Sequence, residues 1–463
     1  MAKIQSKDRF ESFASNPTKA VWTLAVPVMM GMLVQTAYSI TDMVFVGRIS
    51  PDAITALAFN MPLFWFSYGI TFGLGNGVTA VIAQNIGRKD KASANNAAEH
   101  GLLIGLILGV IFASSGLLFG EKILTVMGAP ANLMSQTLGY FRIIAGGFIF
   151  SLAGILLRSI FNGEGDTMTP MKFQAVATVV NVILDPIFIF GLDMGVKGAA
   201  LATILSQLIT TFGLLYIIII KKSTFLSLKM RHFKFNRNIL ISIAKIGIPS
   251  SLAMVVMSLG NAVFNKILVG YSPKVVAGFE LSGRLDQIFF LPIMALGHSL
   301  VTLVGMFTGA QRIDLVKKVV FYGLRTGLTI GITGGIIFYF FSPHFFQIFT
   351  KDPLVIEVAV SLVRTLSFFY WIISIGMLSG RMMQGMGYGL PPLIITLIRV
   401  ILISIPLTYY FTQIAGKPYY WVWYSIALSA TTAGSVGFGW LWTKIKSLEK
   451  KHPINLEKQV EHI

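Results

Sequence analysis

Residues 199–220 read AALATILSQLITTFGLLYIIII and contain no Asp, Glu, Lys or Arg. Two further apolar runs are residues 102–119, which carry no charge, and residues 393–411, which carry a single arginine. A helix needs about 20 mostly apolar residues to cross the roughly 30 Å hydrocarbon core of a bilayer. Because a helix satisfies its own backbone groups in lipid, these runs predict an all-α integral membrane protein.

The composition of the whole chain supports this interpretation. Of its 463 residues, 54% are hydrophobic and only 12% are charged, whereas soluble domains carry about 25% charged residues. The formal net charge is +18, but the basic residues gather in predicted loops and tails, where they would lie beside anionic lipid. We therefore expect the lipid bilayer, and not nucleic acid, as the partner of this charge.

Turn and breaker residues divide the chain into twelve predicted transmembrane helices. With the N-terminus inside, 22 Lys and Arg residues fall in the inside loops and tails and six in the outside loops. This bias predicts a multi-pass protein of the plasma membrane with both termini in the cytoplasm. The predicted spans are residues 20–46, 53–85, 97–119, 132–161, 170–190, 195–220, 238–269, 275–309, 317–341, 355–383, 391–412 and 418–443.

The two halves of the sequence match each other at one fixed offset. The offset that brings Pro27 onto Pro249 also brings Gly165 onto Gly387. Gly and Pro have backbone roles that other residues rarely replace, so the match predicts two pseudo-symmetric six-helix bundles of the same topology. The predicted lobes are residues 1–220 and 239–463, which includes the C-terminal tail, joined by a basic cytoplasmic linker, residues 221–238.

The first half carries acidic and polar residues where the second half is apolar. Asp42 meets Phe264 at this offset, and Asp185 meets Leu407. A carboxyl group inside a bilayer is costly and usually functional, although Asp42 also lies near the end of its helix and Asp185 precedes Pro186. Helical spacing places three polar stripes on single faces: Gln35, Tyr38, Ser39 and Asp42; Gln174, Thr178, Asn181 and Asp185; and Thr203, Gln207 and Thr210.

Several classes of protein are excluded by what the sequence lacks. It has no cysteine, so disulfides, zinc–thiolate sites and cysteine nucleophiles are excluded. It has no G-x-x-x-x-G-K-[ST] motif for ATP, and its six histidines show no metal-binding spacing. We predict that the chain is not an enzyme and needs no cofactor beyond a coupling ion.

Four segments resemble the multidrug and toxic compound extrusion (MATE) family, in its DinF-like branch. They are residues 41–48 (TDMVFVGR), 162–170 (NGEGDTMTP), 181–191 (NVILDPIFIFG) and 195–203 (GVKGAALAT). The resemblance covers nearly the whole chain. It implies twelve helices in two lobes around a central V-shaped cavity, and export of organic cations or amphipathic drugs against an inward gradient of H⁺ or Na⁺.

The resemblance also implies roles for particular residues. Residues that match Asp42, Asn181, Asp185 and Thr203 form an ion site in similar proteins, and the residue that matches Pro27 lets the first helix bend. Gln35, Tyr38, Ser39, Thr178, Asn162 and Arg158 are candidates for the substrate cavity.

Arg158 departs from the family pattern, which has Asn there. An arginine at this position would replace a cation ligand, pair with an aspartate, or extend to the membrane surface. The first two arrangements disfavour Na⁺, and the third leaves Na⁺ possible at Asp42, Asn181, Asp185 and Thr203.

Proton coupling follows from the physical chemistry of a buried carboxyl group. Burial disfavours its charged form, so it would take up a proton from an acidic exterior and release it inside. Protonation would change the hydrogen bonds available in the first lobe, and aromatic side chains that line the cavity would attract organic cations.

We expect such a protein to act as a monomer. The alternative function is a lipid-linked oligosaccharide flippase of the same superfamily, since such a protein needs basic residues to hold a pyrophosphate.

Overall fold

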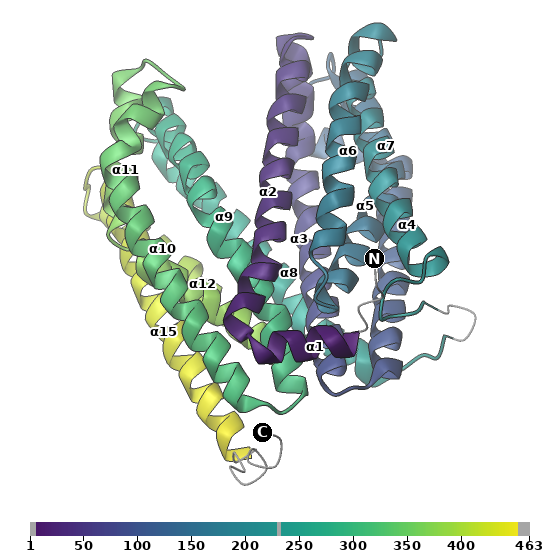
Figure 1. The fold of residues 1–463 in the computed structure, drawn as a ribbon. Coiled ribbons are helices and arrows are strands. Elements are labelled where there is room, and N and C mark those ends of the chain that lie inside the picture. Colours follow the sequence, from purple (N-terminus) through teal and green to yellow (C-terminus); the bar gives the residue numbers. More distant parts are fainter. Residues whose placement is uncertain (1–5, 229–232, 452–463) are drawn as a thin grey trace, which may run out of the picture. The chain divides into compact units, whose positions relative to one another are not determined.

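The first half of the chain is built from long helices (Figure 1). The computed structural model describes residues 6–228 and 233–451. Four residues used in the charge count, Lys3, Lys229, Arg231 and Lys458, lie outside this part. The elements are α1 (Ser6–Ser15), α2 (Pro17–Gly47), α3 (Pro51–Gly87), α4 (Lys91–Val126), α5 (Met134–Gly163), α6 (Met168–Pro186), the π-helical turn η1 (Ile187–Gly191), α7 (Val196–Leu215) and the π-helical turn η2 (Tyr216–Ile220).

The second half repeats this arrangement with more interruptions. Its π-helical turn η5 falls close to the position that the repeat offset assigns to η1. The elements are α8 (Arg237–Val269), α9 (Pro273–Gly309), α10 (Ile313–Gln347), α11 (Pro353–Ser367), α12 (Tyr370–Gly385), α13 (Leu390–Leu397), η4 (Ile398–Ser404), α14 (Ile405–Tyr409), η5 (Tyr410–Ile414) and α15 (Trp421–Lys451).

These helices define a multi-pass membrane protein. Within the described residues, ten helical segments are long and apolar enough to span a membrane, and the bent pair α11–α12 makes an eleventh. The 31-residue helix α15 is less apolar and lies at the last predicted span, residues 418–443. Large apolar side chains such as Leu118 and Phe321 are 75% and 71% exposed, as expected for surfaces that face lipid. The prediction of an all-α membrane protein is confirmed.

The predicted span 355–383 is not one continuous helix. Helices α11 and α12 meet at an angle of 66° around Phe368 and Phe369, where no Gly or Pro occurs. The break packs against α10, where a Cβ added to Gly331 would stand 2.4 Å from the Trp371 Cα, and one added to Gly335 would stand 2.5 Å from the Ser367 carbonyl oxygen. These glycines let the broken backbone approach α10 closely, a contact that the sequence of α11–α12 does not reveal.

The repeat extends to backbone conformation. Gly165 and Gly387, which are repeat equivalents, have φ angles of +77° and +94°. This left-handed region favours glycine, so the tight turn at residues 163–166 recurs in the second half. Lys89 and Gln311, which are equivalent at the same offset, have φ angles of 60° and 58°.

The chain divides into two compact units, each made of two separate stretches of sequence. Residues 6–11 and 26–247 belong to the first unit, and residues 12–25 and 248–451 belong to the second. The chain therefore changes unit inside α1, between Glu11 and Ser12, and again inside α2 and inside α8, shortly before Pro27 and Pro249. Since these prolines are repeat equivalents, the crossing points in α2 and α8 occupy the same position in the repeat.

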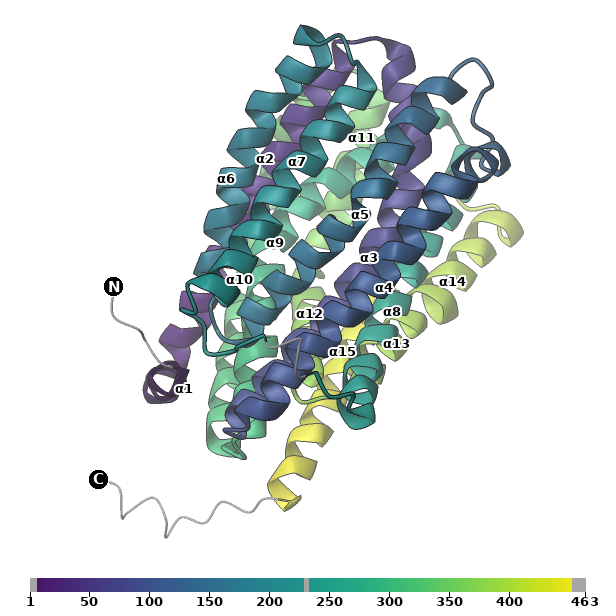
Figure 2. The same ribbon diagram turned by 90° about the vertical axis from the view of Figure 1, so that its right-hand side faces the viewer.

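Helix α5 lies at the centre of the first unit, packed on α3, α4 and α7 (Figure 2). Small residues on α4 make this packing close. A Cβ added to Gly109 would stand 3.0 Å from the Ile149 Cα, and one added to Gly116 would stand 2.4 Å from the Ala145 Cβ. Small residues at such contacts are typical of helices that associate in membranes, and they fix the position of α5 and of Arg158 on it.

Candidate functional site

The polar faces of α2 and α7 meet in the first unit. The hydroxyl oxygens of Tyr38 and Thr203 are 2.8 Å apart and share a hydrogen bond. Tyr38 comes from α2 and Thr203 from α7, so the bond joins two of the three predicted polar stripes. Tyr38 also interacts electrostatically with Asp42 and Asp185, which places all three side chains in one region.

The two carboxyl groups of this region differ in their surroundings. Asp185 is fully buried near the end of α6, and its Oδ1 accepts a hydrogen bond of 3.3 Å from Asn181 Nδ2. Asp42 is half-buried on α2, and the two carboxyl groups interact electrostatically. No ion pair joins Asp42 to Arg48 within the described residues, so nothing there ties this carboxyl group to the helix end.

Four oxygen atoms of this region are buried without a hydrogen-bond partner. They are Asp42 Oδ1, Asp185 Oδ2, Asn181 Oδ1 and Thr178 Oγ1. Buried polar atoms in native proteins nearly always have a partner, and a carboxylate or amide oxygen can accept a proton donor or a cation. The arrangement is therefore suited to taking up a proton or another small cation.

A polar cavity of about 70 Å³ lies beside these groups. Arg158 of α5 reaches into it and donates from Nη1 to Gln174 Oε1 at 2.7 Å, and Gln174 Nε2 donates to Gln35 Oε1 at 3.1 Å. Arg158 thus joins α5 to α6 and α2 and makes no ion pair with Asp42 or Asp185. The cavity is lined by Gln35, Tyr38, Phe150, Ser151, Gly154, Ile155, Arg158, Gln174, Ala177, Thr178, Ser206, Gln207, Thr210 and Thr211.

Not every candidate residue lies at this cavity. The Ser39 hydroxyl donates to the Gln35 carbonyl oxygen of its own helix at 3.0 Å, and Ser39 does not line the cavity. Asn162 is the next-to-last residue of α5, in the turn toward α6. Pro27 is buried inside α2, next to the point where the chain changes unit.

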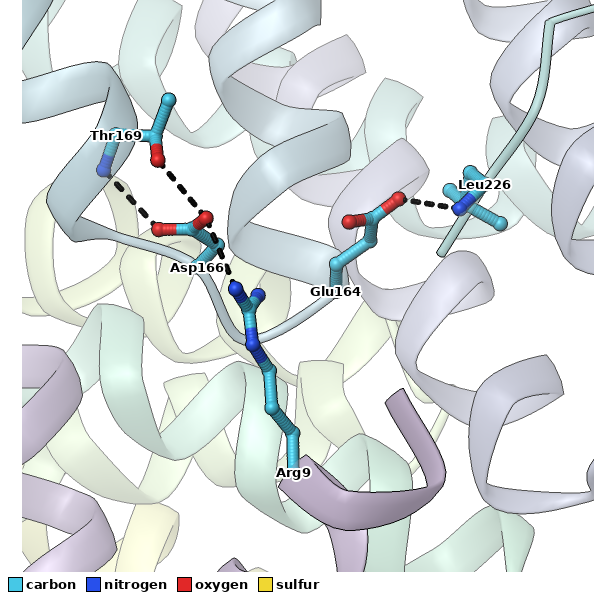
Figure 3. Close-up of polar contacts among 5 residues, drawn as sticks. All are labelled: Arg9, Glu164, Asp166, Thr169 and Leu226. Atoms are coloured by element: carbon cyan, nitrogen blue, oxygen red, sulfur yellow. Dashed lines mark hydrogen bonds and ion pairs between the residues drawn. The ribbon is translucent and has the colours of Figure 1, made fainter. Parts of the chain in front are cut away.

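The turn between α5 and α6 contains acidic residues that the polar stripes did not indicate (Figure 3). Asp166 pairs with Arg9 of α1 at 3.2 Å and accepts from the Thr169 hydroxyl at 2.9 Å. Glu164 accepts from the Leu226 backbone N–H at 2.8 Å. At the repeat offset, Met386 and Tyr388 replace Glu164 and Asp166, a difference that the comparison of halves could have revealed.

Glu164 is the more deeply buried of these two acids, with an exposed fraction of 2%. Burial raises its pKa to about 7, although the Leu226 amide and the Arg9 guanidinium act in the opposite direction. Glu164 therefore titrates near neutral pH, and it does so in contact with the segment that leads out of the first half.

Two acids of helix α9 in the second unit have neutral partners. Asp286 accepts a hydrogen bond from the Tyr370 hydroxyl, and Glu280 accepts one of 2.6 Å from Asn265 Nδ2. Neither Asp286 nor Glu280 forms an ion pair with Lys266 or Arg284 among the described residues.

Buried carboxyl groups inside a bundle of membrane-spanning helices define the class of protein. Intramembrane acids of this kind mark ion and substrate pathways in membrane transport proteins. A family model described as MatE matches residues 27–187 and again residues 249–410. The chain therefore belongs to the MatE family, and its internal repeat corresponds to two copies of the family unit.

Relatives of known sequence are multidrug transporters by name. The probable multidrug resistance protein NorM of Thermotoga maritima is 27% identical over 396 residues, covering 84% of this chain and 85% of the relative. The multidrug export protein MepA of Staphylococcus aureus is 28% identical over 414 residues, covering 87% and 89%. The family consists of transporters and not of enzymes.

Solved structures show the same fold. The outward-facing conformation of a multidrug resistance MATE family transporter of the MOP superfamily has a TM-score of 0.89 and 30% identity, covering 94% of this chain and 97% of the other. A MOP superfamily transporter from Pyrococcus furiosus, described as having a binding pocket of reverse polarity that suggests a different function, has a TM-score of 0.89 and 29% identity, with the same coverage. MATE structures in bent and straight conformations also match.

Proposed function

We propose that this protein is a secondary antiporter that exports organic cations or amphipathic drugs in exchange for inward-moving protons. The observation that carries the proposal is the pair Asp42 and Asp185, whose buried oxygens lack hydrogen-bond partners inside a membrane-spanning bundle. Membership of the MatE family supports the transport class. The names of the relatives support multidrug export.

The proposed roles follow from the contacts. Asp42 and Asp185 carry the proton together, so that any pKa values measured in this site belong to the pair. Asn181 orients Asp185 through the bond to Oδ1. A change in the charge of the carboxyl pair alters the Tyr38–Thr203 hydrogen bond, which attaches α2 to α7. Helix α2 responds by bending at Pro27.

Sodium is the competing coupling ion. The same unpartnered oxygens, with Thr203, would bind Na⁺ as a hard cation that prefers oxygen ligands. Arg158, on the neighbouring cavity wall, disfavours a second positive charge by Coulomb repulsion, whereas a proton neutralises a carboxyl group. This difference favours H⁺.

The test uses purified protein in liposomes with a fluorescent organic cation as substrate. A pH gradient is imposed without sodium, and separately a sodium gradient is imposed at symmetric pH with a protonophore. We expect substrate movement with the pH gradient. Movement only with the sodium gradient would overturn the proton assignment, and movement with neither would contradict antiport.

The remaining assignments belong to the same proposal. The protein works as a monomer in the plasma membrane, with both termini in the cytoplasm, and needs no cofactor apart from the coupling ion. A lipid-linked oligosaccharide flippase is the second candidate, because Arg158 gives the first-unit cavity a positive charge and the similar Pyrococcus furiosus transporter is described as having a pocket of reverse polarity. Scrambling of a fluorescent lipid-linked pyrophosphate in liposomes would support that function.

A further inference from the structure

Arg158 is a cation inside the first unit without an acidic partner. Ion pairs among the described residues include Arg9–Asp166, Lys274–Asp352, Arg312–Asp314 and Lys317–Glu449, and none of these involves Arg158. The hydrogen bond that Arg158 makes there goes from Nη1 to the neutral Gln174, although a guanidinium group has five N–H donors. Burying a charge inside a protein costs free energy unless the charge is paired. A negatively charged ligand from outside the chain would therefore stabilise this arginine.

The walls of the cavity offer further hydrogen-bond donors and no acid. The Gln207 side-chain oxygen accepts from Ser151, which leaves its amide N–H groups free to donate. The Thr178 hydroxyl is buried without a partner, and Thr210 also lines the cavity. No Asp or Glu is among the lining residues, so the cavity combines a positive charge with neutral donors, which is the composition of an anion site.

The size of the cavity restricts what can enter it. Its volume is about 70 Å³, well below the roughly 300–1,000 Å³ of sites that enclose a drug-sized molecule. A single carboxylate or phosphate group is small enough, and Phe150, Ile155 and Ala177 would contact the apolar part of a molecule that carries it.

We propose that this cavity binds an oxyanion, the carboxylate or phosphate group of a lipid or of a small amphipathic molecule, through the Arg158 guanidinium. This oxyanion site is separate from the carboxyl pair, Asp42 and Asp185, that the antiport proposal uses. An exported molecule that carries a positive and a negative group would bind at both sites. Binding is measured without any ion gradient, so the outcome does not depend on the coupling ion.

The experiment compares thermal stability of the purified protein in phosphatidylcholine nanodiscs with and without octanoate or inorganic phosphate, at constant ionic strength. We expect an anion-dependent rise in the melting temperature of the wild type. Arg158→Gln should weaken the apparent affinity by about 10- to 100-fold, the range expected for a lost charged hydrogen bond. Arg158→Lys should restore part of it, and Arg142→Gln, an exposed arginine on the same helix, should leave it unchanged.

A second variant keeps the test independent of folding defects. Gln174→Glu places a carboxylate where Arg158 already donates a hydrogen bond. It should raise the melting temperature in the absence of added anion and abolish the anion-dependent rise. A folded Gln174→Glu protein that still responds fully to anion would contradict the proposed role of Arg158.

Nanodiscs of different composition separate the two sources of the oxyanion. If a lipid supplies it, nanodiscs that contain phosphatidylglycerol should stabilise the wild type, but not Arg158→Gln, and should remove the response to octanoate. If a soluble amphipath supplies it, the response to octanoate should persist in phosphatidylglycerol. An equal response of Arg158→Gln and wild type to every anion, or no response of the wild type to any, would overturn the proposal.

Discussion

The Tyr38 hydroxyl lies 2.8 Å from the Thr203 hydroxyl oxygen and so joins α2 to α7 beside two carboxyl groups. This contact links the helix that crosses between the units to a helix that lies wholly within the first unit. Asp42 and Asp185 lie close enough to interact electrostatically with the tyrosine, so a change in charge at either acid alters the electrostatic surroundings of the bond. The bond is therefore a place where proton uptake would act on the attachment of α2.

Removal of this hydrogen bond should weaken both stability and transport. Tyr38→Phe keeps the ring and removes the hydroxyl, so we expect a loss of about 1 kcal/mol, the usual net value of such a bond, and slower efflux. A double-mutant cycle with Thr203→Val checks the assignment by thermal denaturation and efflux. The two changes should be clearly non-additive, and strictly additive effects would mean that the bond does not couple the helices.

Loss of either first-unit carboxyl group should abolish proton-driven efflux. Asp42→Asn and Asp185→Asn keep the size of the side chain but cannot exchange a proton, so we expect efflux to fall by about tenfold or more, as for intramembrane acids in proton pathways. The matched control is Asp286→Asn in the second unit, where Tyr370 already satisfies the carboxyl group. If only the control variant stops efflux at matched expression, the coupling site lies in the other unit.

Most of the fold could be predicted from the sequence because apolar runs in lipid have few alternatives to helix. The twelve predicted spans correspond to the observed helices, and the offset that relates Pro27 to Pro249 also relates the two matches of the family model. The break at Phe368 and Phe369 could not be predicted, since no Gly or Pro marks it and the glycines that accommodate it, Gly331 and Gly335, lie on a different helix. Helix α1 lies outside the predicted spans, because residues 6–15 are mostly polar, although Phe13 is buried.

The candidate site was accessible to sequence reasoning only in part. Helical spacing predicts polar stripes that contain Tyr38, Asp42 and Asp185, and the structure joins two of these stripes through Tyr38 and Thr203, but the roles of these residues remain predictions. The partner of Arg158 depends on side-chain positions that spacing does not determine, and the structure gives it Gln174 and no aspartate. Glu164 appeared to be an ordinary turn residue, because its burial results from the segment around Leu226, 62 residues later.

Glu164 should make stability depend on pH near neutrality. Its pKa is about 7 in the folded protein, raised chiefly by burial, and about 4.3 in an unfolded chain. Between these values the folded state holds a proton that the unfolded state has lost, so stability falls as pH rises through this window, by on the order of 3 kcal/mol in total. Glu164→Gln cannot ionise and should reduce the slope of stability against pH, by the share that Glu164 contributes, in thermal denaturation measured between about pH 5 and pH 8.

The control for the Glu164 titration is Asp90, an acid whose pKa is lowered in the folded protein. Hydrogen bonds from Ser93 lower the pKa of Asp90 at the start of α4, so Asp90→Asn should leave the slope between about pH 5 and pH 8 unchanged. A Glu164→Gln protein that retains the wild-type slope would show that another group titrates in this range.

Pro249 in α8 should matter for transport as much as Pro27 does in α2. The chain changes unit just before each of these prolines, and a proline inside a helix removes one backbone hydrogen bond and allows a bend. Pro249→Ala should restore that bond and raise the melting temperature, since Pro is about 3 kcal/mol less favourable than Ala in a helix interior. The variant should also slow efflux, because the helix becomes stiffer where the chain changes unit.

Pro292→Ala in α9 is the matched control, because Pro292 also lies inside a long helix but far from any change of unit. We expect Pro292→Ala to leave the efflux rate near that of the wild type in the same liposomes. Equal slowing by both variants would assign the effect to general helix rigidity, and unchanged efflux in Pro249→Ala would exclude α8 as a hinge.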